Sequence, residues 1–261
     1  NNWLNLINGT LLISRPGNLV LTDQNAVDFT IPSTSALILN NSGLTINAAI
    51  AANDSSDFIL AGKLELQAGT LNVGNVANNN HNDIEYASTG TPTLIVSGNS
   101  TLNVNGQIRR SVKVLLGSLI YNQSGTSTVH VRGRMPLLTS YNLNRAKFEI
   151  LNEGSSFQMS GNSLLLIDRN GPASNIFGDI YLAPASASVT GGEIRVGTSG
   201  TASNTLFEIN SNTALWNLTV DGTTTSKTLR LLGNPIQIQK NLQVLGSSIF
   251  NANALDVSLG G

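Results

Sequence analysis

Acidic side chains are the first candidates for chemistry in this chain, because an enzyme that acts on acidic polysaccharide needs several carboxylates in one groove. It uses them either as a converging pair or as calcium ligands beside an arginine or lysine base. The acidic pairs that lie closest in the sequence are Asp54 with Asp57, Asp83 with Glu85, and Asp168 with Asp179. None of them is an Asp-Asp doublet, so no catalytic pair is evident from spacing alone.

The segment 78–83 is the best candidate for a metal site. It reads Asn-Asn-Asn-His-Asn-Asp and could supply the amide and carboxylate oxygens that calcium prefers. The Gly-Gly-x-Gly-x-Asp nonapeptide of calcium-binding β-rolls is absent from the sequence. We therefore expect no cofactor, with a structural calcium ion as the single metal worth considering, and we interpret Asp83 and Glu85 as solvated turn charges.

Nucleophilic catalysis has no support in the sequence. The chain has no cysteine, and its many serines do not form the Gly-x-Ser-x-Gly motif. Neither His81 nor His130 stands in the Gly-His-Gly context of polygalacturonases. The sequence therefore predicts that the protein is not an enzyme.

Basic residues gather in one part of the chain. Arg109, Arg110 and Lys113 are followed one repeat unit later by Arg132 and Arg134. Stacked units would bring the two groups together as a modest patch for an anionic glycan or a lipid headgroup. The alternative is that these residues form a solvated edge.

Aromatic residues divide into a core set and one surface candidate. The phenylalanines at inward-compatible positions are Phe58, Phe148, Phe157, Phe207 and Phe250, and we expect them to stack in the core. Trp216 follows Leu215 in an alternating run and could face either way. An exposed Trp216 beside Tyr181 or Tyr141 would be the best carbohydrate platform.

Composition narrows the class of protein. Only 11% of the 261 residues are charged, and the net charge is −1. This balance gives no electrostatic drive toward nucleic acid. No apolar run is long enough to span a membrane as a helix. Abundant Asn, Gly, Ser and Thr instead indicate many turns.

A phrase of thirteen to sixteen residues recurs along the chain, and it must position all of these side chains. It consists of an apolar-alternating run, a small polar turn and a second alternating run, and it occupies residues 10–22, 36–48, 63–75, 93–106, 118–133 and 146–161. Alternation is the period of a β-strand, and repetition at about 25 to 30 residues indicates a solenoid. We predict an all-β, right-handed parallel β-helix of about ten coils, forming one segment over residues 1–261.

Three longer segments interrupt the repeat, at residues 75–92, 106–117 and 168–192. Insertions in a solenoid become loops that often carry binding. The sequence begins and ends within strand-like runs, as expected of an internal fragment of a longer repetitive protein.

The strand phrases resemble the repetitive passenger regions of large surface proteins of gliding Bacteroidota that are exported by the type IX secretion system. The resemblance lies in Asn82-Asp-Ile-Glu-Tyr86, Thr101-Leu-Asn-Val-Asn-Gly-Gln-Ile-Arg-Arg110 and Leu215-Trp-Asn-Leu-Thr-Val220. More distantly, the coil pattern is similar to filamentous-haemagglutinin-type adhesins. The resemblance implies a β-solenoid adhesin or surface filament that is located outside the cell.

These observations favour a structural and adhesive rod that contacts surfaces or polysaccharide at many weak points. Two alternatives remain open at this stage. One is a polysaccharide lyase or glycoside hydrolase on a parallel β-helix, which requires acids or calcium beside Arg109 or Arg132. The other is a passive cargo domain of a secretion or motility machine, with secretion-system or cell-surface lipoproteins as partners.

Overall fold

Stacked coils of three strands build the protein, as the computed structural model shows for residues 4–22, 27–50, 56–75, 81–111, 117–134, 146–169 and 176–260. These residues contain 24 strands and no helix. Every pair of labelled strands is parallel, with one isolated antiparallel bridge between Gly178 and Ile209. The predicted all-β parallel β-helix is therefore confirmed.

The first two strands of each coil belong to a 15-stranded sheet that bends at a corner. Its members are β1 (Gly9–Ile13), β2 (Gly17–Thr22), β4 (Ser35–Ala48), β6 (Lys63–Val73), β8 (Thr93–Val96), β9 (Thr101–Val104), β11 (Ile120–Gln123), β12 (Thr128–Val131), β14 (Ser156–Met159), β15 (Leu164–Ile167), β17 (Ser186–Val189), β18 (Glu193–Val196), β20 (Leu215–Gly222), β22 (Ile236–Gly246) and β24 (Val257–Leu259). In β4, β6 and β22 one long strand runs through both positions.

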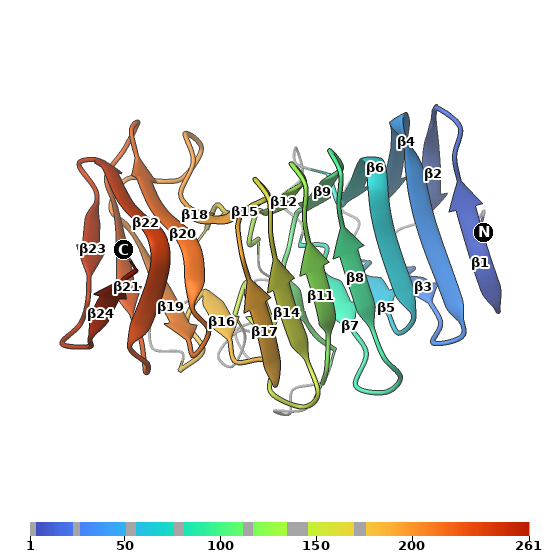
Figure 1. Cartoon of the computed structure of the whole chain (residues 1–261). Helices are drawn as coiled ribbons and strands as arrows, with labels where there is room; N and C mark the ends of the chain where they lie inside the picture. The colour runs from blue at the N-terminus through green and yellow to red at the C-terminus, as the bar shows by residue number, and fades with distance from the viewer. Residues whose placement is uncertain are drawn as a thin grey trace.

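The third strand of each coil belongs to a nine-stranded sheet. Its members are β3 (Phe29–Ile31), β5 (Phe58–Leu60), β7 (Ile84–Tyr86), β10 (Ile108–Arg110), β13 (Phe148–Ile150), β16 (Ile180–Leu182), β19 (Thr205–Ser211), β21 (Lys227–Leu231) and β23 (Ile249–Asn251). Nine strands in the described residues give nine coils, slightly fewer than the ten expected. The coils follow one another along a rod whose chain ends lie at opposite ends (Figure 1).

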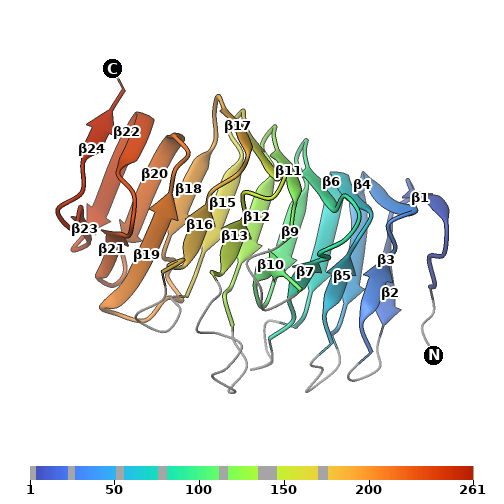
Figure 2. The same cartoon turned by 90° about the horizontal axis from the view of Figure 1, so that it is seen from below.

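The predicted insertions are partly wrong, because each contains regular strands. Residues 75–92 include β7, residues 106–117 include β10, and residues 168–192 include β16 and β17. β7, β10 and β16 are only three residues long, too short for alternation to reveal them. Figure 2 shows this row of short strands along the lower side of the rod.

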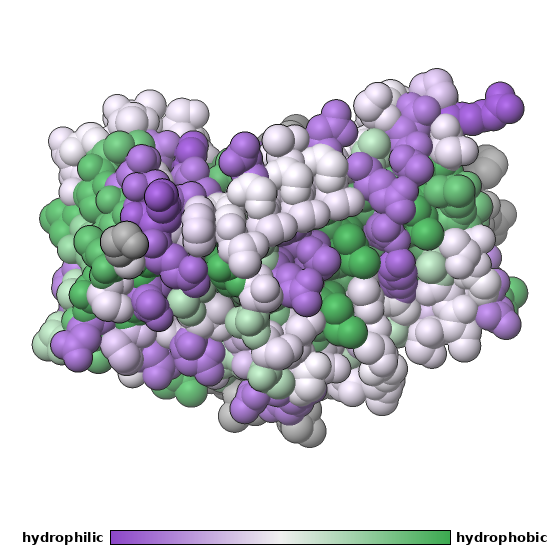
Figure 3. Space-filling model, viewed as in Figure 1, coloured by the Kyte–Doolittle hydropathy of each residue, from purple (hydrophilic) through white to green (hydrophobic). Residues whose placement is uncertain are grey.

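One continuous hydrophobic core runs between the two sheets. Inward side chains alternate with outward ones, as in β6, where Leu64, Leu66, Leu71 and Val73 are buried. The expected aromatic core is confirmed for four phenylalanines that are fully buried, and Phe250 is partly buried against the same core. Green hydrophobic atoms are exposed at both ends of the rod (Figure 3). The exposed large side chains of the end coils are Ile7, Leu12, Leu19, Val20, Val244, Ile249 and Leu259.

A Ser-Gly-x-Ser corner joins the first and second strands in three successive coils, at residues 97–100, 124–127 and 160–163. The last serine of each corner is buried, and its hydroxyl donates to the carbonyl of the first serine. The glycines stack directly on one another. A Cβ added to Gly125 would lie 2.5 Å from the Gly98 carbonyl oxygen, and the φ of Gly125 is +71°. This corner therefore requires glycine both for its backbone conformation and for its close approach.

Candidate functional site

Aspartates occupy the same position in three successive coils, directly before β3, β5 and β7. The Asp57 amide donates to Asp28 Oδ1 at 2.8 Å, and the Asp83 amide donates to Asp57 Oδ1 at 2.8 Å. Asp83 Oδ1 in turn accepts from the Gln107 amide at 2.6 Å. Each carboxylate thus binds the amide of the next coil at the corner where the chain enters the second sheet. This aspartate ladder holds its oxygens at fixed positions.

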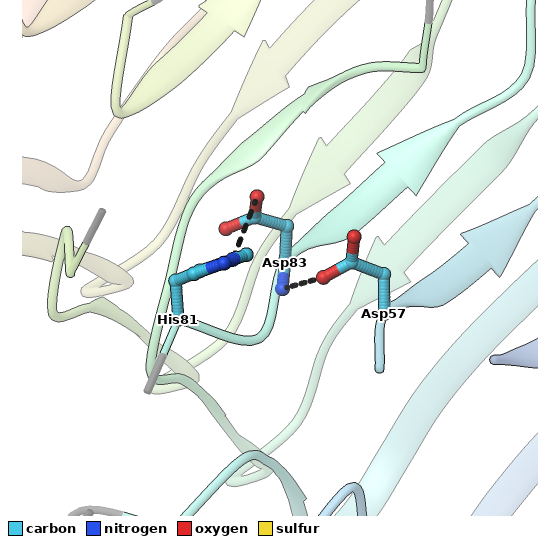
Figure 4. A group of neighbouring side chains, drawn as sticks. All are labelled: Asp57, His81 and Asp83. Atoms are coloured by element: carbon cyan, nitrogen blue, oxygen red, sulfur yellow. Dashed lines mark hydrogen bonds and ion pairs between the residues drawn. The ribbon is translucent and has the colours of Figure 1, made fainter. Parts of the chain in front are cut away.

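Asp57, His81 and Asp83 converge at this corner (Figure 4). One ligand atom from each of the three side chains lies within 4.8 Å of the others. His81 Nδ1 is 4.0 Å from Asp83 Oδ2, which is too long for a hydrogen bond. The Nδ1 atom is shielded from solvent and has no hydrogen-bond partner among the described residues. Asp83 is fully buried, so its interpretation as a solvated turn charge was wrong.

Arg109 partly neutralises the acidic cluster. Its Nε atom donates to Asp83 Oδ2 at 2.7 Å, and Nη2 forms an ion pair with Glu85. Burial opposes the charge on Arg109, but Asp83 and Glu85 hold its pKa above the ordinary value. Three carboxylates thus face one guanidinium, which leaves an excess of negative charge when Asp57 is ionised.

Protonation is one way in which the protein reduces this excess. Burial, followed by repulsion from Asp83, raises the pKa of Asp57 to about 8. Burial also lowers the pKa of His81, and Arg109 adds to the effect although Asp83 opposes it. At neutral pH the ring of His81 is therefore a neutral imidazole with a lone pair available for a ligand.

The same column continues into the next coils with Gln107, Lys147 and Asp179, the residues before β10, β13 and β16. The Lys147 amide donates to the Asp179 carbonyl at 2.8 Å, and Asp179 Oδ2 accepts from the Glu208 amide at 2.8 Å. Lys147 is buried, and its Nζ atom has no hydrogen-bond partner within the described ranges. Burial lowers the pKa of Lys147 to about 8, against the attraction of Asp179 and Asp83.

Two members of the expected surface patch, Arg109 and Arg110, are buried, at 5% and 0% exposure. The Arg110 amide donates to Glu149 Oε1 at 2.8 Å, and its guanidinium lies 5.0 Å from the centre of the Phe177 ring. The Glu149 carboxylate accepts this hydrogen bond in place of a backbone carbonyl of the neighbouring strand, because β10 and β13 are paired only at Ile108 and Phe148. Surface contact by these two arginines is therefore not supported, because both are enclosed by intramolecular partners. Lys113 lies outside the described residues.

Arg132 and Arg134 do come together, and Arg169 of the next coil joins them. Burial, then repulsion by Arg169 and Arg132, lowers the pKa of Arg134. A cavity of about 440 Å³ lies here, lined by Gly133, Arg134, Asp168, Arg169, Gly200, Thr201, Ala202 and Thr205. Arg132 faces a neighbouring cavity of about 280 Å³ beside the asparagines of β4, β6 and β9. We call Arg132, Arg134 and Arg169 the arginine corner.

Trp216 lies at an irregularity in the pairing of β20 with β22 and is partly buried against the core. Tyr181 lies on β16 in the other sheet, where it packs edge-on against Phe177 at 4.9 Å. Tyr141 is outside the described residues. The predicted aromatic platform therefore has one half-buried member and no described partner beside it.

No protein-family model matches this chain. Searches of curated proteins and of solved structures also found no significant match. In the part of the chain that the structure describes, no helix is long and apolar enough to cross a membrane. The functional argument therefore depends on the geometry of the two polar clusters.

Sequence reasoning missed the meeting of Asp57 with His81 and Asp83. It compared acids that are close in sequence, whereas the ladder joins residues 26 and 29 positions apart. A readable signal existed: an aspartate directly precedes a short apolar run at Asp28-Phe29, Asp57-Phe58 and Asp83-Ile84. Chemically, the cluster provides one imidazole and two carboxylates for a cation, and the arginine corner provides three guanidiniums for an anion.

Proposed function

We propose that this chain is a structural and adhesive rod of a large bacterial cell-surface or secreted protein, and that it contacts acidic polysaccharide. The arginine corner carries the proposal. Its guanidiniums repel one another, and among the described residues Asp168 is the one carboxylate that lines its larger cavity. A uronate or sulfate group supplied from outside would relieve this repulsion through charge-assisted hydrogen bonds.

Rod architecture supports weak binding at many points. Coils with a continuous core present fixed outward faces, and repeated copies on a cell would add avidity to a weak single contact. The location outside the cell follows the resemblance of the strand phrases and is part of the proposal. Labelling of intact cells with an impermeant reagent tests it, and labelling only after lysis would contradict it.

The binding test compares matched arginine pairs. We expect the rod to bind immobilised polygalacturonate more tightly than neutral dextran, and less tightly as salt increases. Arg134→Gln combined with Arg169→Gln should weaken binding at least about tenfold, since the loss of even one charged hydrogen bond costs about 1.5 to 3 kcal/mol. The control is Arg195→Gln combined with Arg230→Gln, whose guanidiniums already pair with Glu193 and Glu208.

Equal loss in both double variants, or equal binding to dextran, would refute the assignment to the arginine corner. Absence of any polysaccharide binding by the folded protein would refute adhesion to this class of ligand.

A second candidate is a polysaccharide lyase, because Asp57, Asp83 and Glu85 do meet beside Arg109. Elimination needs a base that removes a proton, and the carboxylate partners of Arg109 keep its pKa high and its guanidinium protonated. Arg109 and Asp83 are also buried, away from any polymer. We expect that incubation with polygalacturonate and calcium yields no unsaturated product, which ultraviolet absorbance would detect. If the wild type forms this product and Arg109→Lys does not, the lyase is favoured.

A further inference from the structure

Two carboxylates and a histidine at one corner form a ligand set, and their charge is not balanced. Asp57, Asp83 and Glu85 lie beside Arg109, and Asp83 is fully buried and also attracts the Lys147 ammonium, which burial disfavours. A buried excess of negative charge is costly unless a proton or a cation neutralises it. A divalent cation bound at this corner would neutralise it.

His81 provides an independent observation. Its Nδ1 atom is shielded from solvent, makes no hydrogen bond to the part of the chain that the structure describes, and lies on the side of Asp83 Oδ2 (Figure 4). A buried polar atom without a partner is rare in a folded protein. We propose that Asp57, His81 and Asp83 bind one divalent transition-metal ion, with zinc as the best-matched ion.

The choice of metal follows from the ligand types. Imidazole nitrogen suits zinc and related ions, whereas calcium takes six to eight oxygen ligands. Zinc ligands lie about 2.0 to 2.2 Å from the ion. The three ligand atoms lie within 4.8 Å of one another, and binding of the ion requires them to move closer together.

Existing hydrogen bonds leave room for the ion and orient its ligands. Asp83 Oδ1 accepts from the Gln107 amide and Oδ2 from Arg109, but each carboxylate oxygen has a further lone pair. Asp57 Oδ1 is fixed by the Asp83 amide. These partners resemble the outer contacts that position ligands in metal sites. The imidazole is 21% exposed, which gives the ion a route from solvent.

Zinc titration of the chelator-stripped chain, without a histidine tag, tests the proposal. Calorimetry should show one zinc ion per chain, and the melting temperature should rise with zinc concentration. Calcium at equal concentration should bind more weakly. The chain has only two histidines, so NMR can assign the shifted imidazole to His81 directly.

Matched variants decide the site. Asp57→Asn keeps an acceptor for the Asp83 amide and removes the charge, so it should fold well and bind zinc at least about tenfold more weakly. His81→Ala should lose binding to a similar degree. His130→Ala is the control, because His130 pairs directly with Asp168 at 2.7 Å and should not contribute.

Three results would overturn the proposal. They are no zinc binding by the folded wild type, unchanged binding in both Asp57→Asn and His81→Ala, or loss of binding in His130→Ala. Tighter binding of calcium than of zinc would overturn the assignment to a transition metal. None of these measurements depends on adhesion, so the metal site and the proposed function can fail separately.

Discussion

Gly125→Ala is expected to destabilise the rod more than substitution of a glycine in open space, because it affects both the backbone and the coil spacing. Its φ of +71° costs an L-residue about 1 to 2 kcal/mol. The new Cβ would also lie 2.5 Å from the Gly98 carbonyl oxygen, a backbone atom that cannot rotate away. Forcing the coils apart adds about 1 to 3 kcal/mol, as in overpacked cores. Alanine also restricts the unfolded chain, which stabilises the folded state by about 0.4 to 1 kcal/mol. The net loss in free energy of unfolding is therefore about 2 to 4 kcal/mol.

Two control glycines separate these contributions. Gly154 has a φ of +80° with open space around its Cβ position, and Gly17 has open space without a positive φ. Urea unfolding followed by circular dichroism should rank the losses as Gly125→Ala, then Gly154→Ala, with Gly17→Ala near zero. If Gly125→Ala and Gly154→Ala lose the same free energy, the close stacking of the corners does not contribute and the reasoning fails.

Further predictions concern the buried charges. Because the pKa of Asp57 is raised to about 8 in the folded chain, the metal-free protein should lose stability as pH rises from about 4 to about 8. In melting experiments, Asp57→Asn should reduce this dependence of stability on pH. An unchanged dependence would contradict the assignment of the raised pKa to Asp57. Since the pKa of Lys147 is lowered to about 8, stability should rise between about pH 8 and 10.5. Lys147→Met should abolish that rise and maintain or increase stability at pH 7; a loss in urea unfolding would show that the ammonium group has a partner. Glu149→Ala leaves Arg110 buried without this carboxylate and should lower the free energy of unfolding by about 3 to 5 kcal/mol. The control Glu193→Ala, at the surface, should lower it by less than about 1 kcal/mol. Equal losses in urea unfolding would contradict this prediction.

Alternation predicted the fold because each coil needs an inward apolar side chain at every second position. Leu64 and Leu66 in β6 follow this rule, and the same spacing recurs in the next coil at Leu94 and Val96. The third strand escaped prediction in the coils of β7, β10 and β16 because three residues cannot show a period. Residues 146–161 were counted as one repeat, although they contain β13 of one coil and β14 of the next. Because such a unit spans parts of two coils, the number of repeats in the sequence differs slightly from the number of coils in the structure.

The candidate sites were predictable only where the residues that meet lie close together in the sequence or at the same position in successive repeats. Arg132 and Arg134 formed a predicted cluster, and Arg169 was missed because its coil begins after a segment of irregular length. Arg110 was assigned to the surface from its charge, whereas the Glu149 carboxylate makes its burial possible. Partners of this kind come from coil stacking, which pairwise sequence spacing does not reveal.

The hydrogen bonds between coils point along the rod, and the two chain ends lie at its opposite tips (Figure 1). A pull between the tips therefore loads the outermost coil first, since each coil contacts only its neighbours. One coil of 26 residues, the spacing of Asp57 and Asp83, would release about 90 Å of extended chain. It occupies only about 4.8 Å of the rod before it unwinds. Under tension the rod would thus lengthen in large steps and act as an extensible tether.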